Sequence, residues 1–106
     1  MRHGFIKTAA GTPKIQVADC VYNAGEILKL IRQMETEGAK IMAFPELCIT
    51  GYTCQDLFWQ TLLLDSAKEQ LVWLAGETSQ VDALIIVGLP WEYNGKLYNV
   101  AAVLNR

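Results

Sequence analysis

One glutamate in this chain follows directly on a predicted strand end. Residues 40–44 form a short apolar run, and Pro45 and Glu46 come immediately after it. An apolar run of this kind is typical of a strand that is covered on both faces. In open α/β sheets the reactive groups lie at the carboxyl ends of strands. Glu46 is therefore a candidate functional residue. On position alone the alternative, a solvated loop glutamate without a catalytic role, stays open.

The spacing of the cysteines and the histidine does not indicate a second catalytic group. Cys20, Cys48 and Cys54 form no Cys-x-x-Cys pair, and the single histidine, His3, stands at the terminus. An odd number of cysteines without such a pair favours reduced thiols over disulfides, and we expect no metal site. Cys48 and Cys54 fit small apolar packing positions. A thiol enzyme that pairs Cys54 with Glu46 is a weaker alternative, because it has no histidine base and no cationic neighbour to lower the thiol pKa.

The composition is typical of one small folded domain. The chain has 106 residues, of which 52% are hydrophobic, and a net charge of −2 from nine Lys and Arg against eleven Asp and Glu. That apolar fraction is too high for disorder, and the acidic balance predicts no nucleic-acid partner. No apolar run reaches the roughly 18 residues that span a bilayer, and the N-terminus lacks a signal-peptide pattern. We therefore expect no membrane contact and a cytoplasmic location.

The first half of the chain reads as a strand, a helix and a strand. Residues 5–10 and residues 40–44 are the two strands. Between them Asn23 is a candidate N-cap, with Glu26 three residues later, and apolar residues recur at helical spacing as far as Gly38. This spacing predicts a helix that begins at Asn23. A strand, a helix and a strand in this order predict parallel strands and a right-handed crossover.

The second half reads as one or two helices followed by a hairpin. Asp56 is a candidate cap for a short apolar helix, and residues 65–66 carry a second capping pattern that predicts a restart. Residues 83–89 form the clearest apolar strand of the chain. The Asn-Gly pair at 94–95 is a strong signal for a two-residue hairpin turn. Lys96–Leu104 is then the returning antiparallel strand.

The segment around Glu46 resembles the first signature of the nitrilase, or carbon–nitrogen hydrolase, superfamily. Residues 44–52 read FPELCITGY, with an apolar strand, then Pro-Glu, then a short stretch that ends in Gly-Tyr. Other segments are similar to one subgroup, the bacterial glutamine-dependent NAD synthetases: TCQDLF at 53–58, VGLP at 87–90 and LYNVA at 97–101. Together these segments extend the resemblance over nearly the whole chain.

The resemblance implies a Glu-Lys-Cys triad. In that chemistry a cysteine attacks a carbon–nitrogen bond and forms a thioester, a glutamate is the general base, and a lysine stabilises the oxyanion. Glu46 matches the family's glutamate, and Tyr52 matches a tyrosine that shapes the glutamine pocket. The lysine and the nucleophilic cysteine follow the hairpin in the family, and no residue of this chain matches either. Cys48 and Cys54 fall inside the glutamate motif.

The same resemblance implies the fold and the domain organisation. The family domain is an α-β-β-α sandwich, so this chain is predicted to be α/β, with about four strands and two or three helices in the order β-α-β-α-β-β. Residues 1–106 would be the N-terminal portion of a glutaminase domain, and glutamine the substrate. No nucleotide-binding motif occurs in the chain. We therefore expect no cofactor here, with ATP and Mg in a separate synthetase domain that amidates deamido-NAD.

Two interpretations from different classes stay open. In the first, the chain carries only the base of a glutaminase site and is inactive alone. In the second, it is a stand-alone binding or assembly module. The final strand, Lys96–Leu104, would leave an unpaired sheet edge, and an uncovered apolar sheet face would favour association. We therefore expect a homo-oligomer that forms through the sheet edge or the sheet face.

Overall fold

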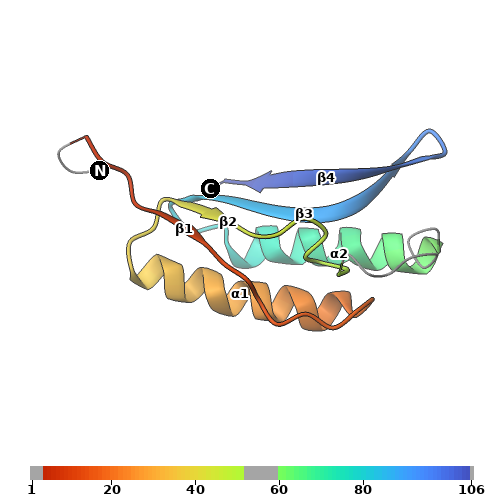
Figure 1. Cartoon of the computed structure of the whole chain (residues 1–106), viewed down its shortest axis with the longest axis horizontal. Helices are drawn as coiled ribbons and strands as arrows, with labels where there is room; N and C mark the ends of the chain where they lie inside the picture. Colours follow the sequence, from red (N-terminus) through yellow and green to blue (C-terminus); the bar gives the residue numbers. More distant parts are fainter. Residues whose placement is uncertain (1–3, 52–59, 106) are drawn as a thin grey trace.

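The described part of the chain forms a four-stranded sheet and two helices in the predicted order (Figure 1). The computed structural model describes residues 4–51 and 60–105. Its elements are β1 (Thr8–Ala10), α1 (Cys20–Thr36), β2 (Ile41–Ala43), α2 (Thr61–Glu77), β3 (Leu84–Tyr93) and β4 (Lys96–Leu104). Within these ranges, no helix combines the length and the apolar character that a membrane crossing needs.

The strand order places both helices on one face of the sheet. The strands lie in the order β1-β2-β3-β4, with the first three parallel and β4 antiparallel to β3. The connection from β1 through α1 to β2 and the connection from β2 through α2 to β3 move in the same direction across the sheet. Because such crossovers are right-handed, both helices lie on the same face. Figure 1 shows α1 and α2 packed side by side below the strands. The opposite face of the sheet is covered by neither helix.

The core lies between the sheet and the helices. Ile85, Val87 and Leu89 of β3 are buried, because alternate side chains of a strand point to the same face. Ile27 and Ile31 of α1 are fully buried at helical spacing. The central residue of β2 belongs to the same buried cluster. This packing fixes β2, and with it the turn that follows β2.

Helix α1 begins earlier than predicted. Asp19 is the N-cap, and its carboxylate accepts a hydrogen bond from the backbone N–H of Tyr22 at 3.0 Å. Asn23 lies inside the helix and is fully buried. The predicted cap at Asn23 is wrong because its side chain bonds to the backbone of Gln16 and Ile49, outside the helix, and a local capping pattern carries no information about those partners.

Helix α2 is continuous from Thr61 to Glu77. The predicted restart at residues 65–66 is wrong, because both residues lie inside this helix. Asp65 is exposed and Ser66 is half-buried, so the polar pattern there marks the water-facing side of a helix and not its start. The buried residues of the helix are Leu63, Leu64, Ala67 and Leu74. The cap predicted at Asp56 lies outside the described residues.

The β3–β4 hairpin has the predicted two-residue turn. Asn94 and Gly95 have φ angles of 53° and 74°, the positive values that a type I′ turn requires. Tyr93 pairs with Lys96 across the turn. The two-residue turn fixes the register of every further pair along the hairpin, because pairing is counted outward from it.

Strand β3 runs past Pro90, where the predicted strand ended. Pro90 lies opposite Asn99 of β4. The pairing of β3 with β2 stops at Ile86, so the Pro90 part of β3 has a strand on one side only. A residue without an N–H is tolerated where one side of a strand is unpaired. The proline therefore lies in the part of the hairpin that extends beyond β2.

Candidate functional site

A tight turn at the carboxyl end of β2 carries Glu46. Residues 46–50 form consecutive turns. The backbone N–H groups of Thr50 and Gly51 both donate to the Leu47 carbonyl, at 3.2 and 2.7 Å. Leu47 has a φ of 52°, in the left-handed region that non-glycine residues rarely adopt. Glu46 therefore lies at the predicted strand end, on a backbone whose conformation is closely determined.

Strand β3 meets this turn at Gly88. The backbone N–H of Ile49 donates to the Gly88 carbonyl at 3.2 Å. A Cβ atom at position 88 would lie 2.5 Å from the backbone nitrogen of Leu47 and 2.8 Å from the Cα of Glu46. Backbone atoms at that distance cannot move aside as a flexible side chain can. Only glycine allows β3 to come so close, and this approach sets the position of the Glu46 backbone.

A buried asparagine of α1 holds the other end of the turn. The Asn23 Nδ2 group donates to the carbonyls of Ile49 and Gln16, each at 2.8 Å. The Asn23 Oδ1 atom accepts a hydrogen bond from the Gln16 N–H at 2.7 Å. Beside these bonds, the Ala18 N–H donates to the Thr50 carbonyl at 2.8 Å. A buried side chain whose bonds are satisfied fixes the segments that it joins, so α1 helps to position the Glu46 turn.

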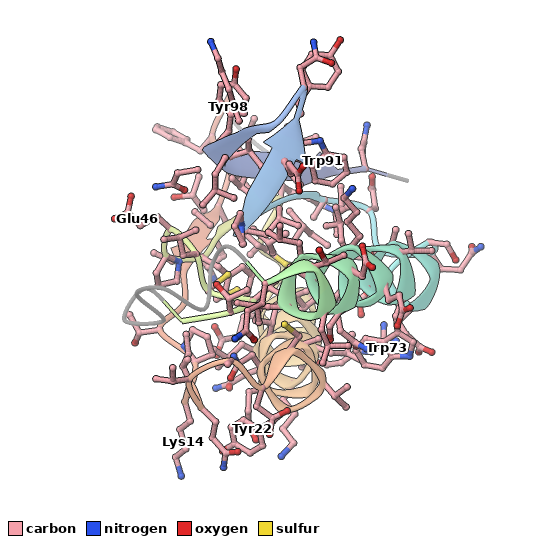
Figure 2. The ribbon with its side chains drawn as sticks, turned by 90° about the vertical axis from the view of Figure 1, so that its right-hand side faces the viewer. Lys14, Tyr22, Glu46, Trp73, Trp91 and Tyr98 are labelled. Atoms are coloured by element: carbon pink, nitrogen blue, oxygen red, sulfur yellow. The ribbon has the colours of Figure 1, made fainter. Side chains whose placement is uncertain are left out.

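The Glu46 carboxylate points away from the helices. Figure 2 shows Glu46 on the side of the sheet opposite α2, whereas Trp91 of β3 lies on the α2 side, where the Lys68 ammonium is 4.8 Å from the centroid of its ring. The Glu46 Oε2 atom accepts a hydrogen bond from Asn99 Nδ2 of β4 at 3.0 Å. Both residues are exposed. An ionised carboxylate has further acceptor sites, so this arrangement leaves Glu46 able to take a proton.

A small pocket opens beside the carboxylate. Its volume is about 180 Å³, and it is lined by Leu47, Pro90, Leu97, Tyr98 and Asn99. Leu47 belongs to the Glu46 turn, and the other four residues belong to the hairpin. The pocket is smaller than the roughly 300–1,000 Å³ of a typical ligand site, so it fits only part of a small molecule. Asn99 both lines this pocket and contacts the carboxylate.

The described cysteines lie in the core. Cys20 and Cys48 are buried, and the Cys48 Sγ atom lies 3.7 Å from the Gly88 carbonyl oxygen. Burial raises the pKa of the Cys48 thiol above its ordinary value, so the thiol stays protonated at neutral pH. A buried, protonated thiol is a poor nucleophile, which agrees with the predicted packing role of Cys48. Cys54 and Tyr52, the predicted glutamine-pocket residue, lie outside the described residues.

Sequence patterns predicted no part in this site for Gly88 and Asn99, and they predicted Asn23 only as a helix cap. In residues 4–51 and 60–105, no group of three or more His, Cys, Asp and Glu side chains could hold a metal ion. The position of Asn99 opposite Pro90 follows from the turn at 94–95, so the sequence contained that signal. The contacts of Asn23 and Gly88 join distant segments and leave no local pattern.

The chain belongs to the carbon–nitrogen hydrolase family. Residues 7–106 match this family, and they include the whole sheet, both helices and Glu46. The fold agrees with that assignment, because an amidase from Nesterenkonia sp. superposes with a TM-score of 0.77 over 97% of this chain and 39% of that chain. At 20% identity, this likeness shows the fold alone. The predicted superfamily and the predicted α/β fold class are both confirmed.

Several relatives of this chain are glutamine-dependent NAD(+) synthetases. The one from Mycobacterium tuberculosis (strain ATCC 25618 / H37Rv) is 33% identical over 105 residues, which cover 99% of this chain. The one from Aquifex aeolicus is 37% identical over 90 residues, or 85% of this chain. The crystal structure of the Cytophaga hutchinsonii synthetase superposes with a TM-score of 0.87 and 30% identity, over 94% of this chain and 17% of that chain. The chain spans 16% of the length of the first two relatives and matches the N-terminal hydrolase region of these enzymes.

Proposed function

We propose that this chain supplies the general base of a glutamine-hydrolysing site and that Glu46 is this base. The observation that carries the proposal is the position of the carboxylate, at the end of β2, beside a pocket and bonded to Asn99. The relatives' name, glutamine-dependent NAD(+) synthetase, supports the side-chain amide of glutamine as the substrate. In this proposal Tyr52 shapes the glutamine pocket.

The proposed chemistry divides between Glu46 and residues outside this chain. Glu46 takes the proton of a cysteine thiol while the sulfur attacks the amide carbon, and a lysine stabilises the oxyanion. The carbon–nitrogen bond then breaks, and ammonia leaves with that proton. Water attacks the remaining thioester, Glu46 takes a proton from the water and returns it to the thiolate, and glutamate leaves. No residue of positions 1–106 matches the lysine or the cysteine, so we propose that the chain alone is inactive.

The same proposal places this chain within a larger cytoplasmic enzyme. The ammonia would pass to a synthetase domain that uses ATP and Mg²⁺ to amidate deamido-NAD, and this chain would bind no cofactor of its own. Two findings support this organisation: the relatives are NAD(+) synthetases, and the chain matches 16% of their length.

The role of Glu46 can be tested in a chimera. The chain replaces the matching segment of the Mycobacterium tuberculosis synthetase, and ammonia release from glutamine is measured with and without the change Glu46→Gln. Loss of a general base should lower kcat by about 10²- to 10⁴-fold. The matched control is Glu92→Gln, which removes an exposed carboxylate from β3 and should keep the parent rate. An unchanged rate in the Glu46→Gln chimera would contradict the proposal.

The inactivity of the chain alone has its own test. The purified chain is incubated with glutamine, and ammonia is measured against a blank without protein. We expect no release above the blank. Turnover that disappears in Glu46→Gln but persists when Cys48 and Cys54 are replaced would show that the chain is active alone, and that part of the proposal would be wrong.

One observation favours a second role, as an assembly module. Strand β4 pairs with β3 only, so its outer edge is unpaired within the described chain. Val103 of this strand is 59% exposed. An unpaired edge beside exposed apolar side chains favours pairing with another strand or sheet. We propose that copies of the chain associate through this edge or the uncovered sheet face, a role that is compatible with the hydrolase function.

A further inference from the structure

The carboxylate of Glu46 is held by a side chain from the far end of the chain. The Asn99 Nδ2 group donates to Glu46 Oε2 at 3.0 Å, and the two residues are 53 positions apart. An ionised carboxylate only accepts hydrogen bonds, so an amide N–H is its complementary partner. A carboxylate that acts as a base needs a defined orientation, because proton transfer requires the acceptor oxygen within hydrogen-bond distance of the donor.

Asn99 is well placed to impose such an orientation. It lies within β4, opposite Pro90, in a register that is fixed by the turn at residues 94–95. A side chain on a strand is held more firmly than one on a loop, because strand pairing fixes its backbone. The partner backbone is fixed by the same hairpin, since Gly88 of β3 lies directly against Glu46. Both halves of the Glu46–Asn99 contact are therefore positioned by the β3–β4 hairpin.

The contact also distinguishes the two oxygens of the Glu46 carboxylate. Asn99 occupies one acceptor site of Oε2, so Oε1 keeps both of its acceptor sites for the proton that is transferred. Asn99 is in addition a wall residue of the pocket beside Glu46. The same side chain thus contacts both the carboxylate and the pocket that part of a ligand can enter.

We propose that Asn99 is a positioning residue for Glu46: its amide holds Oε2 and thereby directs Oε1 toward the reacting thiol and, later, the attacking water. This inference rests on the proposed function of Glu46 as a general base. It adds Asn99, a residue to which sequence patterns assigned no role. In this proposal Asn99 acts through the orientation of the carboxylate.

The first test measures the contact in the chain itself. In the isotope-labelled chain, NMR follows the Asn99 side-chain NH2 signals and the Glu46 carboxylate carbon while the pH is lowered. We expect the Asn99 signals to move with the same midpoint as the Glu46 carbon, and this movement to vanish in Glu46→Gln. Asn99 signals that stay constant while Glu46 takes up its proton would overturn the proposal.

The second test measures the consequence for the reaction. In the synthetase chimera, Asn99→Leu removes the donor at similar volume and should lower kcat about 10- to 100-fold, with little change in KM for glutamine. Asn99→Asp keeps the shape but places a second carboxylate beside Glu46, so the acid limb of the kcat/KM profile should move to higher pH. A side chain at position 99 that lay away from the Glu46 carboxylate would not move that limb. Asn105→Leu, at an exposed asparagine beyond β4, is the matched control and should keep the parent values.

The outcomes separate this inference from the proposed function. An unsubstituted chimera that releases no ammonia contradicts the proposed function. An active chimera in which Asn99→Leu and Asn99→Asp keep the parent kcat and the parent pH profile overturns only the positioning role. Rates are normalised to the folded fraction measured by circular dichroism, so that misfolding of a variant is not counted as lost catalysis.

Discussion

Gly88 helps to determine where Glu46 lies, because it has no side chain. Gly88 has a negative φ, so it is not needed for an unusual backbone conformation. Its role is close approach: the backbone of Leu47 and Glu46 occupies the space that a Cβ atom would fill. The position of the Glu46 carboxylate thus depends on a residue that has no functional group.

We predict that Gly88→Ala lowers the free energy of unfolding by about 1–3 kcal/mol, because a Cβ atom forces backbone atoms apart in a packed region. Guanidinium unfolding followed by circular dichroism measures this change. Gly25→Ala is the matched control, because Gly25 lies inside α1 and a Cβ atom there meets nothing within 4 Å. That substitution should stabilise the chain by up to about 1 kcal/mol. A Gly88→Ala variant as stable as the parent would show that the turn can move aside.

Because of Cys48, the free energy of unfolding should depend on pH in the alkaline range. Burial raises the pKa of its thiol in the folded chain, so folding favours the protonated form. This contribution is fully present below the pKa of the unfolded thiol. It is lost as the pH rises through the pKa of the folded thiol, because the unfolded chain then releases its proton first.

We predict that the stability difference between the parent chain and Cys48→Ala shrinks as the pH rises from neutral to strongly alkaline. The difference in the free energy of unfolding changes by at most about 1.4 kcal/mol per pH unit, the value for the release of one proton. Urea unfolding at a series of pH values measures it, and groups common to both chains cancel in the difference. A difference that is constant over the alkaline range would contradict a buried, protonated thiol.

Among the elements, α1 does more than cover the sheet. Its buried Asn23 bonds to Gln16 before the helix and to Ile49 in the turn after β2. The helix thus joins three segments of chain, and the Glu46 turn is held between α1 on one side and Gly88 of β3 on the other.

We predict that Asn23→Leu destabilises the fold by on the order of 3 kcal/mol, because it leaves buried backbone groups of Gln16 and Ile49 without their partners. Chemical unfolding measures the loss, and hydrogen exchange at residues 49–51 should become faster than in the parent. Asn105→Leu should change neither quantity by a measurable amount. Unchanged exchange at these amides would show that the turn keeps its shape without Asn23.

On the scale of the whole molecule, the uncovered side of the sheet is the prominent feature. The described chain measures 47 × 27 × 21 Å, and both helices lie on one face of the sheet (Figure 1). Leu84 and Val103, on the other face by strand alternation, are 40% and 59% exposed. The strand β4 adds an unpaired edge next to this face.

We predict that the chain self-associates with increasing concentration and that Val103→Lys suppresses this association, because a lysine on an edge strand opposes pairing. Light scattering coupled to size-exclusion chromatography measures the mass over a wide range of concentrations. Val72→Lys is the control: Val72 is 72% exposed but lies on α2, away from the sheet edge. A chain that stays monomeric at high concentration would contradict the association.

The sequence by itself determined the element order, the hairpin and the candidate base. Strand and helix patterns are local, since side-chain periodicity follows directly from backbone geometry. The Asn-Gly turn is equally local, and it already implies that Asn99 lies opposite Pro90. Glu46 was recognisable because its motif is contiguous in the sequence and matches a known family.

The tertiary structure decided how that candidate base is held. The capping patterns at Asn23 and at residues 65–66 were misleading, because the use of a polar side chain depends on which segments it meets after folding. Gly88 and Asn99 gained their roles in the same way: one lies against the Glu46 backbone and the other bonds to its carboxylate. Local sequence can name a reactive group, but its orientation comes from contacts between distant segments, and those exist only in the folded chain.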